Sequence, residues 1–322
     1  MSRRALTLLV TALGLLLLAW QIHSTGLDAI TDGVRRMGVT GLLSILALSG
    51  LRLLLRSTAW IILMQDAARV PLGQAFAAMI AGDAIGNLTP LSLAVSEPAK
   101  AVFVRTHIPP QRALAALAAE NFFYSLSVAL AVLAGVAVLF LKFTFPDWLR
   151  TASLILVPAM AAVVIGGLWL IWKEPALVSS TLARFTRLAG TKAPAYEKFV
   201  EKIRTLETSS YGFVRAQPGR LVGVVLCESA FHVISVAETW VTLAFLGYRS
   251  IALAIVLDTV QRMINVIFRV VPLKIGVDET LSGLMTNALG FGSALGVTMG
   301  VIRKIRVLFW SMVGLVLLRR AI

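Results

Sequence analysis

Long apolar runs recur along the chain and are separated by short polar stretches. Each run is long enough to cross about 30 Å of hydrocarbon as a helix, and none shows the strict alternation of a barrel strand. The pattern therefore predicts an all-α integral membrane protein. The first run follows Arg3 and Arg4 without a small-x-small cleavage site, so we expect an uncleaved span. The expected full spans, about six in number, cover residues 5–23, 39–64, 113–141, 151–172, 221–247 and 294–318.

Two further apolar stretches, residues 72–106 and 251–290, are each interrupted near the middle by a proline. In TPLSLAVSEP and in VPLKIGVDET, the proline is followed seven residues later by a glutamate. Because proline removes a backbone donor and clashes with the preceding turn, Pro90 and Pro272 argue against continuous helices. Each half is short for a crossing. The pattern predicts two re-entrant helical hairpins, which enter the bilayer and leave on the same side.

Composition and charge support this interpretation. Hydrophobic residues make up 58% of the chain and charged residues 14%, whereas a soluble domain has about 25% charged residues. The net charge of +14 belongs to no nucleic-acid motif, so we expect no nucleic-acid partner. With both hairpins re-entrant, the basic loop residues gather mainly on one side, which the positive-inside rule makes cytoplasmic. We expect a multi-pass protein of the bacterial cytoplasmic (inner) membrane with both termini in the cytoplasm.

The same topology divides the chain, residues 1–322, into two similar parts of a single transmembrane domain. Residues 39–141 and residues 221–318 each contain a span, a hairpin and a span, in opposite orientations. Residues 173–220 between them are expected to form a cytoplasmic amphipathic linker. Inverted repeats are typical of transporters, because two mirror-like halves can expose one central site to either side. The alternative is that the proline–glutamate spacing recurs by chance.

Many ionisable residues remain at membrane depth. A central charge costs about 2.5 to 3.5 kcal/mol even on the lenient scale, so these side chains must face one another, water or a ligand. They are Arg52, Arg56, Lys100, Arg262, Arg269, Lys274, Arg303, Lys304, Arg306, Asp83, Glu97, Glu120, Glu228, Glu238, Asp258, Asp278 and Glu279. Mutually neutralising struts are one explanation. Because broken helices also leave backbone groups unpaired, the whole set favours a polar cavity near the midplane.

Sequence spacing groups some of these charges. Arg52 and Arg56 share one helix face, and Asp258 and Arg262 are spaced for an internal pair. A surplus of guanidinium groups suits a phosphate-bearing amphiphile, while the carboxylates could balance charge, relay protons or hold a cationic group. The expected lipid-binding residues are Arg52, Arg56, Asn87, Pro90, Glu97, Lys100, Glu120, Arg262, Arg269, Pro272, Lys274, Glu279 and Arg303.

Other chemistries find little support in the residues. The histidines are scattered, and HExxH, CxxC and phosphate-cradling motifs are missing from the sequence. Glu228 and His232 share a helix face, which is more typical of a hydrogen-bonded interior pair than of a metal site. The single cysteine, Cys227, permits neither a disulfide framework nor a thiolate cluster. We expect no metal, no cofactor and no enzymatic activity.

Four motifs resemble a known family. They are LRLLLRSTAW (51–60), TPLSLAVSEPAKA (89–101), AAENFFYSL (118–126) and VPLKIGVDE (271–279). At these residues the chain resembles the transmembrane, flippase-like domain of the lysylphosphatidylglycerol synthase/flippase family. The resemblance covers nearly the whole chain. It implies translocation of a membrane lipid, or a supporting role in lipid or glycolipid synthesis.

The chain departs from the family pattern at several positions. Ser96 stands where glycine usually precedes the glutamate, and Leu91 and Leu273 stand where glycine is common after the proline. Asn121 follows Glu120 where arginine is usual. These departures concern the substrate more than the fold. The soluble aminoacyl-transferase domain of bifunctional members has no counterpart in this sequence, so the resemblance does not imply lipid aminoacylation.

Three functions follow from these observations. The first is a flippase-like lipid transporter. The second is an accessory subunit or intramembrane enzyme of lipid or glycolipid biosynthesis, such as hopanoid or lipid-linked sugar synthesis, working with a lipid-modifying or glycosyl transferase. The third is a structural scaffold in which all embedded charges pair internally. We expect the first, with a membrane lipid as the ligand.

Overall fold

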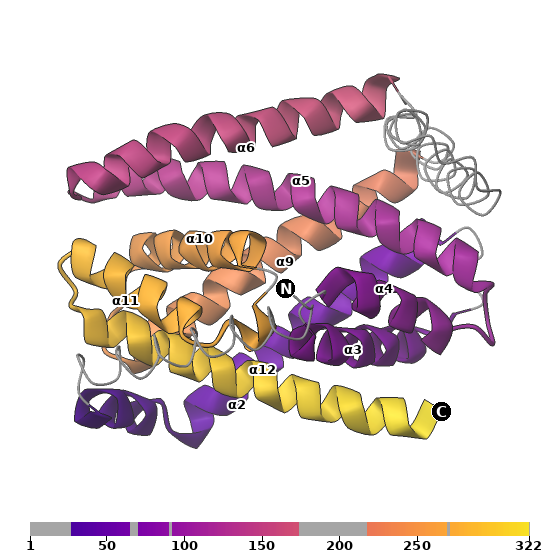
Figure 1. The fold of residues 1–322 in the computed structure, drawn as a ribbon, viewed down its shortest axis with the longest axis horizontal. Coiled ribbons are helices and arrows are strands. Elements are labelled where there is room, and N and C mark those ends of the chain that lie inside the picture. Colours follow the sequence, from indigo (N-terminus) through magenta and orange to yellow (C-terminus); the bar gives the residue numbers. More distant parts are fainter. Residues whose placement is uncertain (1–26, 65–69, 90–91, 174–217, 269–270, 322) are drawn as a thin grey trace, which may run out of the picture.

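The computed structural model describes residues 27–64, 70–89, 92–173, 218–268 and 271–321, and the regular structure in these ranges is entirely helical. Figure 1 shows the helices in sequence colours. They are α2 (Leu27–Leu63), α3 (Leu72–Leu88), α4 (Ser92–Phe103), α5 (Pro110–Lys142), α6 (Asp147–Lys173), α9 (Pro218–Phe245), α10 (Ile251–Ile267), the 3₁₀ turn η2 (Pro272–Lys274), α11 (Val277–Ala288) and α12 (Ser293–Ala321).

Four of the described helices are long and apolar enough to cross a membrane. They correspond to the expected spans 39–64, 113–141, 151–172 and 221–247, and lie within α2, α5, α6 and α9. The expected span 294–318 forms α12, which is not among the four and carries basic residues in its middle. The expected span 5–23 lies outside the described residues, as do residues 174–217 of the expected linker. The described part of the chain is thus entirely helical in its regular structure and has the long apolar helices of a multi-pass membrane protein.

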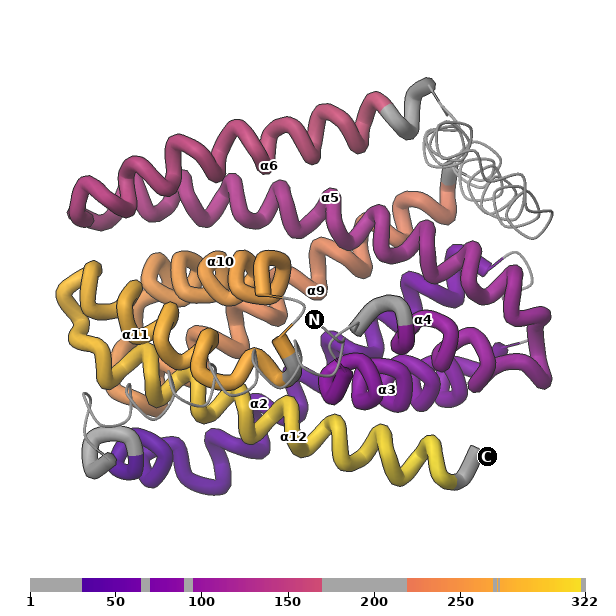
Figure 2. Tube along the Cα trace, viewed as in Figure 1, coloured from indigo at the N-terminus to yellow at the C-terminus, as the bar shows by residue number. Residues whose placement is uncertain are grey.

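The helices surround a central region rather than forming a simple row. α5 and α6 pack side by side along one edge, while α2 packs against both α9 and α12. α3 and α4 lie at one end of the molecule, and α10 and α11 lie at the other (Figures 1 and 2). Two short helix pairs therefore approach the middle of the protein from opposite ends.

Both helix pairs are broken at the expected places. α3 ends at Leu88 and α4 begins at Ser92, while α10 ends at Ile267 and α11 begins at Val277. The helices of each pair pack against each other, and η2 contacts α3, so the two breaks meet. We call α3 with α4 the first broken pair and α10 with α11 the second broken pair.

Two apolar clusters flank the middle of the molecule. One contains Trp60 and joins α2 to the first broken pair and α5. The other contains Ile45 and joins α2 to α9, α10 and α12. Arg52 and Arg56 lie between these two α2 positions. The packing that holds each broken pair thus places the arginines at the centre.

Candidate functional site

Two adjoining cavities occupy the centre of the described structure. The inner cavity has a volume of about 230 Å³, and the lateral cavity has a volume of about 420 Å³. They adjoin because they share lining residues from α2, α3, α5, α10 and η2. The shared residues are Arg56, Asp83, Asn87, Tyr124, Asn265 and Lys274.

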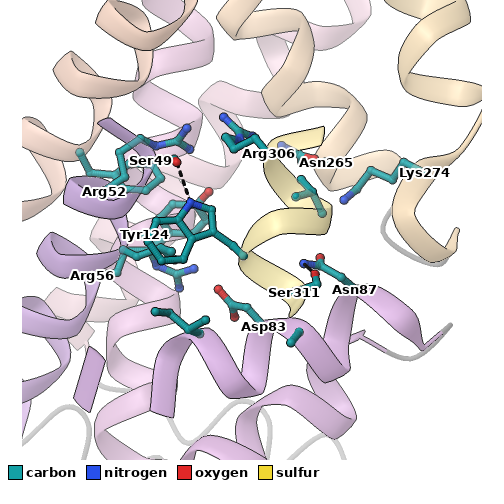
Figure 3. Close-up of a pocket in the computed structure, with 16 residues that line it drawn as sticks. Ser49, Arg52, Arg56, Asp83, Asn87, Tyr124, Asn265, Lys274, Arg306 and Ser311 are labelled. Carbon is teal, nitrogen blue, oxygen red and sulfur yellow. Dashed lines mark hydrogen bonds between the residues drawn. The ribbon is translucent and has the colours of Figure 1, made fainter. Parts of the chain in front are cut away.

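The inner cavity is surrounded by basic side chains. The guanidinium groups of Arg52 and Arg56 lie on one side, and Lys274 reaches in from the opposite side (Figure 3). Arg306 of α12 also lines this cavity. Among the described residues that line either cavity, Asp83 is the sole carboxylate. The lining therefore presents mainly cationic donors.

Arg52 and Arg306 share one carboxylate behind the cavity wall. Arg52 Nη1 lies 2.9 Å from Glu238 Oε2, and Arg306 Nη1 contacts Glu238 Oε1. The Arg52 guanidinium also lies 4.6 Å from the centroid of the Phe231 ring. Its Nε atom is buried and has no hydrogen-bond partner in the described part of the chain. Arg52 thus keeps a donor that its protein neighbours do not satisfy.

Arg56 is held differently, by a carboxylate of its own. Its Nε and Nη2 donate to the two oxygens of Glu120 at 2.8 and 2.9 Å, and its guanidinium lies 4.5 Å from the centroid of the Tyr124 ring. Glu120 is fully buried. A bidentate pair of this kind fixes the orientation of the planar guanidinium group.

Arg262 brings a further guanidinium group to the lateral cavity. Its Nε and Nη2 donate to Asp258 Oδ2 at 2.8 and 2.6 Å, which confirms the pair expected from their spacing on one helix. Its Nη1 contacts His232 Nδ1 on α9. Asp258 thus orients Arg262 between the cavity and α9.

The lateral cavity also has an apolar side. Val128 of α5, Met160 and Val163 of α6, and Val266 of α10 line it. Val163 is 44% exposed and Val266 is 54% exposed, so the cavity reaches the apolar outer surface near α6 and α10. A charged chamber is therefore connected to a surface that suits hydrocarbon.

Several expected site residues lie outside the linings of the two cavities. Lys100 Nζ bridges Asp83 at 2.8 Å and Glu97 at 3.0 Å within the first broken pair. In the second broken pair, Glu279 accepts a hydrogen bond from the Gly276 amide at 2.9 Å. Arg303 Nη1 lies 3.0 Å from Asp278 Oδ1 and joins α12 to α11. These side chains tie the helices that carry the cavity wall.

The remaining expected residues have varied positions. Asn87 lines both cavities and donates to Ser311 Oγ at 3.4 Å. Pro272 is the first residue of η2, at the second break. Pro90 and Arg269 lie outside the described residues.

Sequence reasoning missed part of the lining. Asp83 and Arg306 were recognised as charges at membrane depth but were not assigned to the site. The sequence marks the other lining residues less clearly as members of a polar site. These residues are Ser49, Tyr124, Asn265, Trp310 and Ser311. An amide in an apolar helix, as at Asn265, does indicate a polar neighbour. The described ranges contain no group of three or more His, Cys, Asp or Glu side chains that could hold a metal ion.

The fold and the cavities define a helical membrane protein with a charged chamber between two broken helix pairs. A family model described as lysylphosphatidylglycerol synthase TM region matches residues 5–314. The chain therefore belongs to this family, as its motifs indicated, and the membership supports a function related to membrane lipids. A search of curated proteins and a search of solved structures each found no match.

Proposed function

We propose that this protein binds an amphiphilic lipid at its centre and moves the lipid head group across the bilayer. The observation that carries the proposal is the junction of the two cavities: the inner cavity is lined by charge, and the lateral cavity has an apolar side that meets the outer surface. A lipid likewise consists of a charged or polar head group and apolar hydrocarbon. Its head group would occupy the inner cavity and the adjoining charged part of the lateral cavity, where Arg262 lies, and its hydrocarbon would leave between α6 and α10.

The lining favours a head group that bears a phosphate. Guanidinium groups form paired, charge-assisted hydrogen bonds to phosphate oxygens, and the Lys274 ammonium adds a positive charge on the far side. Arg52 shares the Glu238 carboxylate with Arg306, and its buried Nε has no hydrogen-bond partner among the described residues, so its positive charge is only partly compensated by the protein. These features support an anionic ligand for the inner cavity.

Movement across the bilayer would use the two broken pairs. In this proposal both are re-entrant hairpins of oppositely inserted repeats, residues 39–141 and 221–318, in the bacterial cytoplasmic membrane. Their breaks meet beside the inner cavity, where η2 contacts α3. Rocking of one repeat against the other would open this point to each side in turn.

Arg52→Gln tests the proposal with little expected damage to the fold, because Glu238 keeps its contact with Arg306. A charge-assisted hydrogen bond is worth about 1.5 to 3 kcal/mol, or roughly a ten- to hundredfold change in rate. We expect a loss of that size in the movement of fluorescent phosphatidylglycerol between the leaflets of reconstituted vesicles.

Arg35→Gln is a suitable control, because this α2 arginine has a side chain that is 82% exposed and lies away from the cavities. It should leave the rate unchanged. The proposal fails if vesicles with and without the protein move the probe equally, or if Arg52→Gln protein is as active as the unaltered protein.

A further inference from the structure

A chain of hydrogen bonds leads from the lateral cavity to the buried carboxyl group of Glu228, which lines neither cavity. His232 Nε2 lies 2.9 Å from Ser127 Oγ, and Ser127 Oγ lies 3.2 Å from Glu228 Oε2. On the other side of the imidazole ring, Nδ1 contacts Arg262 Nη1. Glu228 is 4% exposed, and its Oε1 is buried without a hydrogen-bond partner among the described residues.

The donor groups give this chain a direction. A guanidinium nitrogen can only donate, so His232 Nδ1 accepts from Arg262 and the proton of the neutral ring resides on Nε2. Nε2–H then donates to Ser127, whose hydroxyl can donate to Glu228. The same hydroxyl lies 2.8 Å from the Tyr124 carbonyl, so it can turn between two acceptors. When the hydroxyl is turned toward Glu228, every bond points from the cavity toward that carboxyl group.

Arg262 forms the end of this hydrogen-bond chain that faces the lateral cavity. Asp258 holds its Nε and Nη2, which leaves Nη1 as the nitrogen that contacts His232. Because Arg262 also lines the lateral cavity, an anion bound there would compete with His232 for Nη1. Such competition would free His232 Nδ1 to accept a proton.

We infer that binding of an anionic head group at Arg262 is coupled to the uptake of one proton by Glu228. The inference rests on the proposed lipid site and adds a coupling ion to it. A proton from water in the cavity joins His232 Nδ1, the Nε2 proton passes to Ser127, and the hydroxyl proton of Ser127 passes to Glu228. One proton enters, His232 remains neutral, and the Glu228 carboxylate becomes a carboxylic acid.

The surrounding charges are compatible with this step. The charged groups that face Glu228 and His232 come from α2, α5 and α10, and the cations among them already have carboxylate partners. They are Arg52 with Glu238, Arg56 with Glu120, and Arg262 with Asp258. On α9 itself the neighbour is the Cys227 thiol. Glu228 therefore has no cation of its own, and its neutralisation offsets the negative charge that the ligand brings.

Calorimetric binding of dihexanoyl phosphatidylglycerol to the purified full-length protein tests the coupling. Titrations in buffers with different ionisation enthalpies report the number of protons taken up. We expect about one proton per ligand, and an affinity that rises up to about tenfold for each unit by which the pH falls. Glu228→Gln should take up no proton and should bind with an affinity that no longer depends on pH.

Asp32→Asn provides the matched control, because it makes the same carboxyl-to-amide change at a side chain that is 62% exposed. It should retain the proton uptake. Binding of the probe without proton uptake by the unaltered protein overturns the inference and leaves the lipid site standing, whereas failure of the probe to bind any variant removes both.

Infrared difference spectra between about pH 5 and about pH 8 give an independent readout. They should show a carboxylic-acid carbonyl band, strengthened by the ligand, that disappears in Glu228→Gln. A band that persists in that variant, or that never appears in the unaltered protein, contradicts Glu228 as the proton site.

Discussion

The two broken helix pairs meet at one cavity but are anchored in different ways. In the first broken pair, Lys100 of α4 bridges Asp83 of α3 and Glu97 of α4, so the ion pairs remain within the pair. In the second broken pair, the acidic residues at the start of α11 are matched by bases of α12. The ion pairs of the first broken pair join its own two helices, whereas those of the second broken pair join α11 to α12.

The breaks differ as well. The second break contains Leu273 and Lys274 with positive φ angles of 50° and 49°, a conformation that non-glycine residues rarely adopt. Lys304 of α12 also contacts the Leu273 carbonyl. A strained backbone conformation persists only where contacts with the surrounding structure hold it in place. We therefore regard the second break as fixed on α12 by polar contacts. The first pair also packs closely on α12, where a Cβ atom at Gly314 would lie 2.5 Å from the Ile80 carbonyl oxygen of α3, but its ion pairs remain within the pair.

The largest expected effect comes from removing the cation inside the first pair. Lys100 is 1% exposed, and Lys100→Met leaves Asp83 and Glu97 without their shared partner. Breaking a buried ion pair on one side costs about 3 to 5 kcal/mol. We expect a loss of that order in the free energy of unfolding, measured in mixed detergent micelles.

A charge-neutral replacement provides the control for Lys100→Met. Adding Asp83→Asn and Glu97→Gln to that variant removes the stranded charges, so much of the lost stability should return. If Lys100→Met unfolds at the same point as the unaltered protein, the first pair is not held by its own ion pairs.

The contrast between the pairs also shows what the sequence can reveal. The breaks were predictable because Pro90 and Pro272 interrupt apolar runs, and the Asp258–Arg262 pair was predictable because both residues share one helix face. The Arg52–Glu238 pair was not, because it joins residues far apart in the sequence through the packing of α2 on α9. Sequence spacing reports neighbours within a helix, whereas the cavity lining depends on which helices meet.

A smaller effect is expected where α11 and α12 approach most closely. A Cβ atom at Gly296 would lie 2.0 Å from the Ser282 carbonyl oxygen of α11, so Gly296→Ala requires backbone to move. At Gly82 of the first pair, the nearest atom would be Cγ of the Lys100 side chain, at 2.4 Å. Overpacking typically costs about 1 to 3 kcal/mol.

We expect Gly296→Ala to cost more than Gly82→Ala, because Gly296 meets only the α11 backbone, whereas the closest atoms to Gly82 belong to the Lys100 side chain, which can move further than backbone even though its ion pairs hold it. Thermal unfolding followed by tryptophan fluorescence can rank the two variants. The reverse order would mean that the first pair is the more rigid of the two.

The smallest effect is expected at the polar contact between the first pair and α12. Asn87 donates to Ser311 at 3.4 Å, a long hydrogen bond, so Ser311→Ala should cost only about 0.5 kcal/mol of unfolding free energy. Its counterpart is Thr286 of α11, which is fully buried and accepts from the Gly296 amide of α12 at 3.1 Å. Thr286→Val leaves that amide unsatisfied and should cost about 1 to 3 kcal/mol. Equal losses in the two variants would show that polar contacts hold both pairs on α12 alike.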